Sequence, residues 1–306
     1  MPTRLQLARN EMFQFFEAEP QRIHKQRDLE RILSANRATW RLAESMPFQK
    51  FLKYLLKSGK LHRIEFPFPH RKEIRYSWSA VPLELVLLTL RSGCHFSHYT
   101  AVQLHELTEQ DPRTIYLNSE QCPKPVPIVG LAQDRIDRAF RGKPRTTRNV
   151  APAKGAKQPD MRVCLLNGKH TGYLGVEERE VRSLDGAETV RLRLTDLERT
   201  LIDIAVRPFY AGGVAEVLKA YRRAAKRVSV NRIAGLLRKL NHVYPYHQAI
   251  GFYLDAAGGY DEKAVALFHD RFDYEFDFFL TYGLKDSALD RRWRIYVPKE
   301  FKKKGR

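Results

Sequence analysis

The sequence predicts an α+β protein in which three short helices and a two-stranded ribbon precede a larger, mixed α/β part. Apolar residues recur at helical spacing through residue 57, and two strand-like runs separated by the turn sequence PFPHRKE follow them. Behind these, strand-like and helix-like stretches alternate to the end of the chain. The chain of 306 residues is longer than most single domains, and 43% hydrophobic residues suffice for real cores.

The first part contains three helical patterns. The opening helix is expected to use the apolar residues Leu5, Met12, Phe13, Phe15 and Phe16. Asp28 is expected to cap a second helix, and a third should begin at Ser45 and end at Gly59. The third helix has one apolar stripe, made of Phe48, Phe51, Leu52, Leu55 and Leu56. Strands are expected at Leu61–Phe66 and Ile74–Trp78, so residues 1–80 are predicted to form a winged helix-turn-helix domain.

Residues 81–306 are predicted to form one mixed α/β domain with a basic loop at 141–161. Helices are expected at about 82–91, at 98–107 behind a Ser97 cap, and in three later stretches around 214–221, 233–240 and 250–254. Strands are expected at 115–117, 163–166, 190–194, 274–280 and 293–297. Thr195 and Glu198 have the spacing of a capping box for a helix over 197–205.

The chain is strongly basic. It has 54 Lys and Arg against 35 Asp and Glu, for a net charge of +19. The excess is concentrated in residues 1–78, 124–169, 219–239 and 291–306, a pattern that favours surfaces for a polyanion over a uniformly basic coat. No apolar run is long enough to span a bilayer, the first residues do not resemble a signal peptide, and three cysteines without a CxxC spacing suit a reducing compartment. A cytoplasmic protein with no membrane partner is expected.

The third helix is the predicted reader of double-stranded DNA. When its apolar stripe is turned inward, Gln49, Lys50 and Lys53 face outward, and Gln and Lys can pair with adenine and guanine edges in the major groove. Further DNA contacts are expected from the preceding segment and from the ribbon tip, through Trp40, Arg41, His70, Arg71 and Lys72. The alternatives are an ordinary solvated surface and a winged helix that binds protein.

A second basic surface is expected on the helix near residue 220. The residues concerned lie opposite its apolar stripe: Lys219, Arg222, Arg223, Lys226 and Arg227. Residues 219–239 contain no acid, so we expect no helical ion pairs to balance the repulsion, and RNA or another polyanion is the expected ligand. The alternative is a solvated helix face.

Signatures of catalysis or metal binding are mostly missing. Cys94, His95, His98 and His105 lack the second pair of ligands that a structural zinc site needs. No phosphate-binding loop, HExxH, GxSxG or GxGxxG motif occurs. Asp160, Glu177 and Glu178 are acids that a nuclease could use, but Asp160 has no Lys at the required spacing and the ExK at 300–302 is remote. We therefore expect no enzyme, no cofactor and no metal; the alternative is a defence-linked nuclease or another nucleic-acid-processing enzyme.

Three segments resemble the AbiEi family of antitoxins. They are SHYTAVQLHELT at 97–108, LTDLERTLID at 194–203 followed by Gly212-Gly213, and WRIYVP at 293–298. The resemblance implies an antitoxin of a type IV toxin–antitoxin pair, associated with phage defence. Such a protein represses its own operon through an amino-terminal winged helix and counters a nucleotidyltransferase-like toxin through its carboxy-terminal domain, without requiring a stable complex. The residues themselves indicate a structural role, since Arg199 and Asp203 can pair on one helix face while Glu198 completes the cap.

Overall fold

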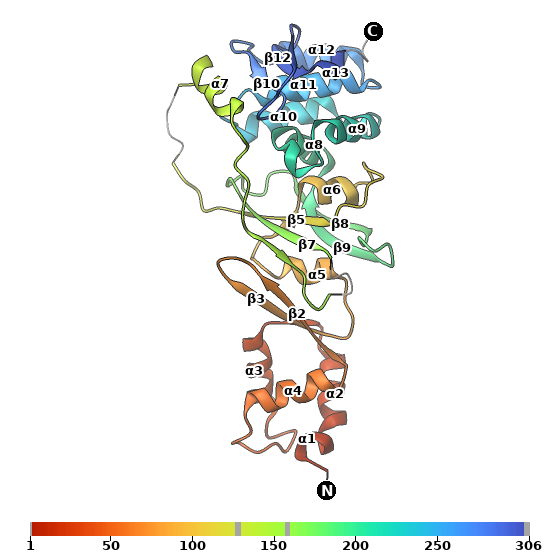
Figure 1. Cartoon of the computed structure of the whole chain (residues 1–306). Coiled ribbons are helices and arrows are strands. Elements are labelled where there is room, and N and C mark those ends of the chain that lie inside the picture. The colour runs from red at the N-terminus through yellow and green to blue at the C-terminus, as the bar shows by residue number, and fades with distance from the viewer. Residues whose placement is uncertain (1, 126–129, 157–159, 303–306) are drawn as a thin grey trace. The chain divides into compact units, whose positions relative to one another are not determined.

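The chain forms two compact units, drawn in Figure 1 from a computed structural model that describes residues 2–125, 130–156 and 160–302. The first unit comprises Met1–Ser92 and Arg148–Cys164, and the second comprises Gly93–Thr147 and Leu165–Arg306. Helices and several separate sheets make the protein α+β. The division is not the consecutive one expected at residue 80, because the first unit also contains residues 81–92 and a segment that returns near residue 150.

The first unit is built from short helices and a small antiparallel sheet. Its helices are α1 (Arg4–Leu7), α2 (Arg9–Ala18), α3 (Gln26–Asn36), α4 (Phe48–Lys57) and α5 (Leu83–Leu88). Its strands are β1 (Ile23–His24), β2 (Leu61–Pro67), β3 (Lys72–Trp78) and β6 (Val150–Pro152). Strands β1, β3 and β2 pair in that order, and the β2–β3 hairpin runs from Leu61 opposite Trp78 to Pro67 opposite Lys72.

Stacked aromatic rings pack in the core of the first unit. Phe16 of α2 stacks on Trp78 of β3 with ring centroids 4.7 Å apart, and both rings are fully buried. Buried Leu29 and Leu33 of α3 complete this core. Asp28 does not cap α3 as expected, because it lies in the first turn, where its carboxylate accepts a hydrogen bond from the Lys25 backbone N–H at 2.8 Å. The acid still satisfies a free backbone donor at the helix start, from three residues further along.

The second unit contains a sheet in which strands lie in the order β7-β5-β4-β9-β8. These strands are β4 (His95–Phe96), β5 (Thr114–Glu120), β7 (Arg162–Gly168), β8 (Val176–Arg182) and β9 (Thr189–Thr195), and β7 begins in the first unit. Strand β4 pairs with β9 in parallel and with β5 antiparallel. A smaller sheet has the order β10-β12-β11, formed by β10 (Phe278–Phe279), β11 (Ser287–Asp290) and β12 (Ile295–Pro298).

Helix α8 (Leu197–Val206) is the centre of the helical part of this unit. It contacts α6 (His98–Leu104), α9 (Val214–Ala224), α10 (Val230–Leu240) and α11 (Tyr246–Ala257), and every one of its residues is buried. These helices gather on one side of the sheet strands in Figure 1. The remaining helices are α7 (Gln133–Arg141), α12 (Glu262–Asp270), α13 (Lys299–Lys302) and a 3-10 turn at Pro208–Tyr210. A helix buried on all sides must place its polar side chains against protein partners.

Several expectations for the second unit are corrected. Helices α7 and α12 and strand β8 were not expected, and the strand expected at 274–280 is reduced to Phe278–Phe279. Asp196, not Thr195, caps α8: its carboxylate accepts from the Arg199 backbone N–H at 2.7 Å, while the Thr195 hydroxyl bonds the Thr200 hydroxyl. The expected basic loop at 141–161 contains β6, with 157–159 outside the described residues, and the basic tail extends beyond them at 303–306.

Within the ranges that the structure describes, no helix has the length and apolar character needed to cross a bilayer.

Candidate nucleic-acid interface

Helix α4 has one buried face and one basic face, as the sequence predicted. Phe51, Leu52 and Leu55 are buried at 0%, 6% and 0% exposure, which anchors the helix in the core of the first unit. On the opposite side Gln49, Lys50 and Lys53 are all exposed. Their side chains form no hydrogen bond or ion pair with any described residue, so they are available to a ligand.

The turn that precedes α4 is organised by one guanidinium group. Arg37 follows α3 and donates through Nη1 to the carbonyl oxygens of Ala43, Glu44 and Met46 at 2.7, 3.0 and 3.1 Å. Three carbonyl acceptors on one donor group fix the path of the chain between α3 and α4. Arg37 therefore sets where α4 begins, and it gave no sequence signal because its partners are backbone atoms.

Trp40 and Arg41, two expected DNA contacts, lie in that turn and differ in exposure. Trp40 is only 3% exposed and stacks on Phe51 with centroids 5.9 Å apart, so its predicted contact with DNA is wrong. Its large ring fills the core beneath the turn, which is the common fate of a tryptophan in a small domain. Arg41 is exposed and has a left-handed backbone, with φ of 53°.

The tip of the β2–β3 hairpin carries the other expected contacts. His70, Arg71 and Lys72 are all exposed there. Acids beside the tip partly neutralise them, since Arg71 pairs with Glu73 at 3.0 Å and Lys72 pairs with Glu65 at 2.9 Å.

Glu73 holds more than one cation. It also pairs with buried Arg75 at 3.1 Å and with Arg91 at 2.7 Å. Burial raises the pKa of Glu73, but Arg91 and Arg75 outweigh that effect and the pKa lies below its usual value. The carboxylate thus keeps three arginines together, and the cluster retains a positive surplus.

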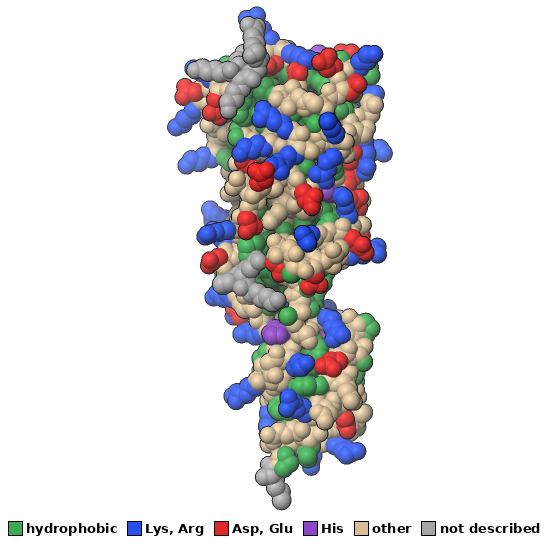
Figure 2. All heavy atoms as spheres, turned by 90° about the vertical axis from the view of Figure 1, so that its right-hand side faces the viewer, with side chains coloured by type: hydrophobic (Ala, Val, Ile, Leu, Met, Phe, Trp, Pro, Cys, Tyr) green, Lys and Arg blue, Asp and Glu red, His purple; other side chains and the backbone are tan. Residues whose placement is uncertain are grey.

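The second basic surface, on α9 and the turn after it, is exposed as expected. Its members are Lys219, Arg222, Arg223, Lys226 and Arg227. The expectation that no acid offsets them is wrong, because Glu216, just before the segment, pairs with Lys219 at 2.6 Å, and Glu109 pairs with Arg223. Acidic and basic side chains are interspersed on the face of the second unit drawn in Figure 2. A partly balanced surface of this kind attracts a polyanion less strongly than unpaired cations do.

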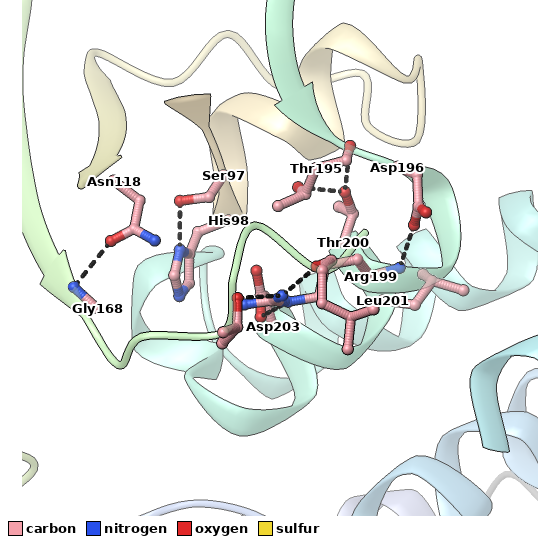
Figure 3. Close-up of polar contacts among 12 residues, drawn as sticks. Ser97, His98, Asn118, Gly168, Thr195, Asp196, Arg199, Thr200, Leu201 and Asp203 are labelled. Carbon is pink, nitrogen blue, oxygen red and sulfur yellow. Dashed lines mark hydrogen bonds and ion pairs between the residues drawn. The ribbon is translucent and has the colours of Figure 1, made fainter. Parts of the chain in front are cut away.

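A buried ion pair holds α8, and it is the pair that the sequence predicted. Arg199 Nε donates to Asp203 Oδ1 at 2.8 Å, and the two side chains are only 8% and 11% exposed. In Figure 3 the Arg199 side chain lies beside Asp203, and its Nη1 also donates to the Leu174 carbonyl oxygen. Burial raises the pKa of Asp203, but the adjacent Arg199 charge outweighs it and the pKa falls below its usual value.

The loop after β7 is held by an acid for which the sequence gives no signal. Glu120, at the end of β5, accepts hydrogen bonds from the backbone N–H groups of Thr171 and Tyr173 at 2.8 and 3.2 Å and from the Thr171 hydroxyl. Asn118 accepts from the Gly168 N–H at 3.0 Å. These contacts join segments about fifty residues apart, so no local pattern indicates them. Together with Arg199, Glu120 and Asn118 hold the loop after β7 in place.

Glu198 does not complete the cap of α8. Its carboxylate accepts from the Ser229 N–H at 3.2 Å and lies 3.5 Å from Arg232, which also pairs with Asp196 at 2.6 Å. Asp196, Glu198 and Arg232 line a groove of about 490 Å³ together with Glu177, Glu178, Arg179, Leu197 and Arg227. Since the groove carries both signs of charge, it is not a simple anion site.

The histidines considered as metal ligands are hydrogen-bonded residues of the second unit's interior. His105 Nε2 lies 2.8 Å from the Thr195 carbonyl oxygen, His98 Nδ1 lies 2.9 Å from the Ser97 hydroxyl, and His95 bonds Gly93 and Asn118. Burial lowers the pKa of both His98 and His105 to about 4. Within residues 2–125, 130–156 and 160–302, no three His, Cys, Asp or Glu side chains are grouped to hold a metal ion. Asp160, Glu177 and Glu178 are exposed, the first in one unit and the others in the second.

Comparison with solved structures identifies a relative in fold. No family model and no curated protein matches the sequence. The crystal structure of the RV2827C protein from Mycobacterium tuberculosis is similar, with a TM-score of 0.60 over 97% of this chain and 92% of that one, at 13% sequence identity. At that identity the likeness concerns the fold, and it extends over nearly the full length of both chains.

Proposed function

We propose that this protein is a DNA-binding transcriptional regulator whose first unit is a winged helix-turn-helix. The observation that carries the proposal is the outer face of α4, where Gln49, Lys50 and Lys53 are exposed and unpaired behind a buried apolar stripe. The order of elements supports it, since α3, a fixed turn and α4 are followed by the β2–β3 hairpin. In a winged helix-turn-helix the second helix of the pair enters the major groove and the hairpin lies against the backbone or the minor groove.

The charge of the first unit supports the same ligand. Lys50 and Lys53 extend from α4, and Arg71 and Lys72 extend from the hairpin tip, where each shares its acid with other cations. A duplex phosphate that meets such a surface releases condensed counterions, which favours binding at low salt. His70 and Arg41 are exposed as well and belong to the proposed contact set, while Trp40 does not.

We further propose that the protein is the autoregulatory antitoxin of a type IV toxin–antitoxin pair. This rests on the resemblance of three segments to AbiEi antitoxins. Two of those segments, at 97–108 and 194–203, form α6 and α8, which lie in contact in the second unit. The proposed partner is a nucleotidyltransferase-like toxin in the cytoplasm, countered without a stable complex. The second unit would then serve antitoxicity, and its basic surface would meet RNA or another polyanion.

The proposal is tested by replacing Gln49, Lys50 and Lys53 with Ala in the full chain. Each lost base contact removes about 1–3 kcal/mol of discrimination, so specific affinity for the DNA upstream of the protein's own gene should fall by more than about a hundredfold in a gel shift. The matched control replaces the exposed Lys239 and Lys263 of α10 and α12, which removes the same charge from the second unit. Unchanged promoter affinity in the triple variant would refute the assignment of α4.

The same variant tests the antitoxin proposal. Cells that carry it together with the neighbouring toxin gene should still grow, because the second unit is untouched, while repression of a promoter reporter should be lost. Failure of the unaltered protein to rescue growth from any neighbouring gene product would overturn the antitoxin proposal. It would leave the DNA-binding proposal to stand on the gel shift alone.

A further inference from the structure

A segment from the middle of the chain belongs to the first unit. Residues 148–164 return there, and β6 pairs antiparallel with the start of β7, with Val150 opposite Cys164 and Pro152 opposite Arg162. We call Val150–Ala156 the strap. Ala151 and Ala153 of the strap are 1% and 0% exposed, so the segment is a packed part of this unit and not the free basic loop that its composition predicted.

The strap is joined to the outer strand of the β2–β3 hairpin. Strand β2 is the edge of the β1-β3-β2 sheet, and edge strands leave backbone groups unpaired. Glu65 and Lys154 satisfy two such groups on each side, since each backbone N–H donates to the other's carbonyl oxygen at 2.9 Å. The strap therefore extends the hairpin sideways by a short antiparallel bridge.

A glycine makes this close approach possible. Gly155 has a φ of +86°, and a Cβ atom placed on it would lie 2.4 Å from the Arg63 carbonyl oxygen. The obstacle is backbone, which cannot rotate away as a side-chain end can. Only glycine combines the left-handed conformation with the absence of a Cβ atom, so the contact between strap and hairpin depends on this residue.

The bridge brings a third cation to the carboxylate of Glu65. That carboxylate already pairs with Arg63 at 2.7 Å and with Lys72 at 2.9 Å. The hydrogen bond from Lys72 lowers the pKa of Glu65, and the charges of Arg63 and Lys154 lower it further. One negative charge thus faces three positive ones, and Lys154 remains exposed.

We propose that the strap is the outer edge of the DNA-binding hairpin and that the ammonium group of Lys154 contacts a phosphate of the DNA duplex. The inference rests on the proposed function of the first unit. It follows from the backbone bridge, which fixes the Lys154 backbone beside β2, and from the surplus of positive charge around Glu65. A duplex supplies closely spaced phosphates to match a row of cations fixed on a sheet edge. The DNA-binding surface therefore includes a residue about eighty positions beyond the hairpin.

Two variants of the full chain test the inference with a short random-sequence DNA duplex as the probe. Lys154→Gln removes the charge and keeps the backbone bridge. Because each phosphate contact contributes about 0.9 to the slope of log affinity against log salt, this slope should become shallower by about that amount. Between about 50 and 200 mM salt, wild-type affinity should therefore fall about threefold more than that of the variant. The matched control is Lys263→Gln, an exposed lysine of the second unit.

Gly155→Ala should detach the strap, because the new methyl group meets the Arg63 carbonyl oxygen. Its control is Gly186→Ala, which has a similar φ of +70° and no atom within 4 Å of the added Cβ. We expect faster amide exchange at Lys154 and Glu65 and weaker duplex binding for Gly155→Ala, with neither change for Gly186→Ala.

The outcomes separate the inference from the proposed function. If the unaltered protein binds no duplex, the proposed function fails. If it binds, and Lys154→Gln has the wild-type salt slope, Lys154 contacts no phosphate and the inference is overturned. If Gly155→Ala does not fold, the Lys154→Gln comparison decides the question by itself.

Discussion

Breaking the ion pair within α8 should destabilise the second unit severely. The change we consider is Asp203→Asn, which removes the negative charge and retains the shape. Arg199 donates to Asp203 at 2.8 Å, and its side chain is only 8% exposed, so water cannot replace the lost carboxylate. The variant therefore leaves a buried cation without its counter-charge.

The size of the expected loss in stability follows from the burial of Arg199. Removing one partner of a buried pair costs about 3–5 kcal/mol, which is a large part of the roughly 5–15 kcal/mol that stabilises a typical domain. Arg199→Met should cost a similar amount, since it also deprives the Leu174 carbonyl oxygen of a donor. The double variant Arg199→Met/Asp203→Leu should cost less than the sum of the single changes, because no charge is left unpaired.

An exposed pair with the same spacing in the same unit is the control. Asp134 and Arg138 of α7 are also four residues apart, but they lie 3.8 Å from each other and are 69% and 83% exposed. Asp134→Asn should therefore cost at most about 0.5 kcal/mol. The assay is urea unfolding followed by amide exchange of Leu197–Val206, which isolates α8 from the first unit. Equal losses of unfolding free energy for Asp203→Asn and Asp134→Asn would refute the argument from burial.

Two further predictions concern charge in the second unit. Buried His98 and His105 have a pKa of about 4 when folded and about 6.5 when unfolded, so the unfolded chain binds more protons between these values. The stability that these neutral histidines contribute is fully present above about pH 6.5. As the pH falls from there towards 4, the free energy of unfolding should drop by about 1.4 kcal/mol per pH unit for each histidine. In acid denaturation, His105→Gln should make this drop shallower by about that amount. On the α9 surface, Arg222→Glu/Lys226→Glu should weaken binding to a random RNA more than Lys219→Glu/Arg223→Glu, since the latter pair is already offset by acids. Equal RNA binding by both double variants and the wild type would leave that face an ordinary solvated surface.

Local periodicity predicted the elements that bury a continuous stripe. In α4, Phe51, Leu52 and Leu55 recur at helical spacing, so both its buried face and the exposure of Lys50 and Lys53 followed from the sequence. The same holds for α8 to α11. Helices α7 and α12 were not predicted, although each buries two apolar residues at helical spacing, Ile136 and Phe140 in the first and Val265 and Phe268 in the second.

Features made by contacts between distant segments gave no local signal. The sequence predicts a loop for the strap, since its pairing with β2 depends on a residue about ninety positions away. Strand β8 carries exposed side chains at nearly every position and shows no alternation. Trp40 was placed on the DNA because it lies beside α4 in sequence, whereas the space between α3 and α4 takes its ring into the core. Composition located the basic segments but not the acids that pair with them.

The pairing of cations distinguishes the two basic surfaces. On the α9 surface, Glu216 and Glu109 neutralise two of the five cations, as expected for a solvated face or a weak polyanion contact. Helix α4 has no acid in its own sequence, and two of its exposed lysines, Lys50 and Lys53, lie three residues apart and have no ion-pair partner among the described residues. Like charges at that spacing destabilise a helix by a few tenths of a kcal/mol. Because a bound phosphate backbone would turn that repulsion into attraction, α4 should gain protection from amide exchange when duplex DNA binds, and the α9 surface should not.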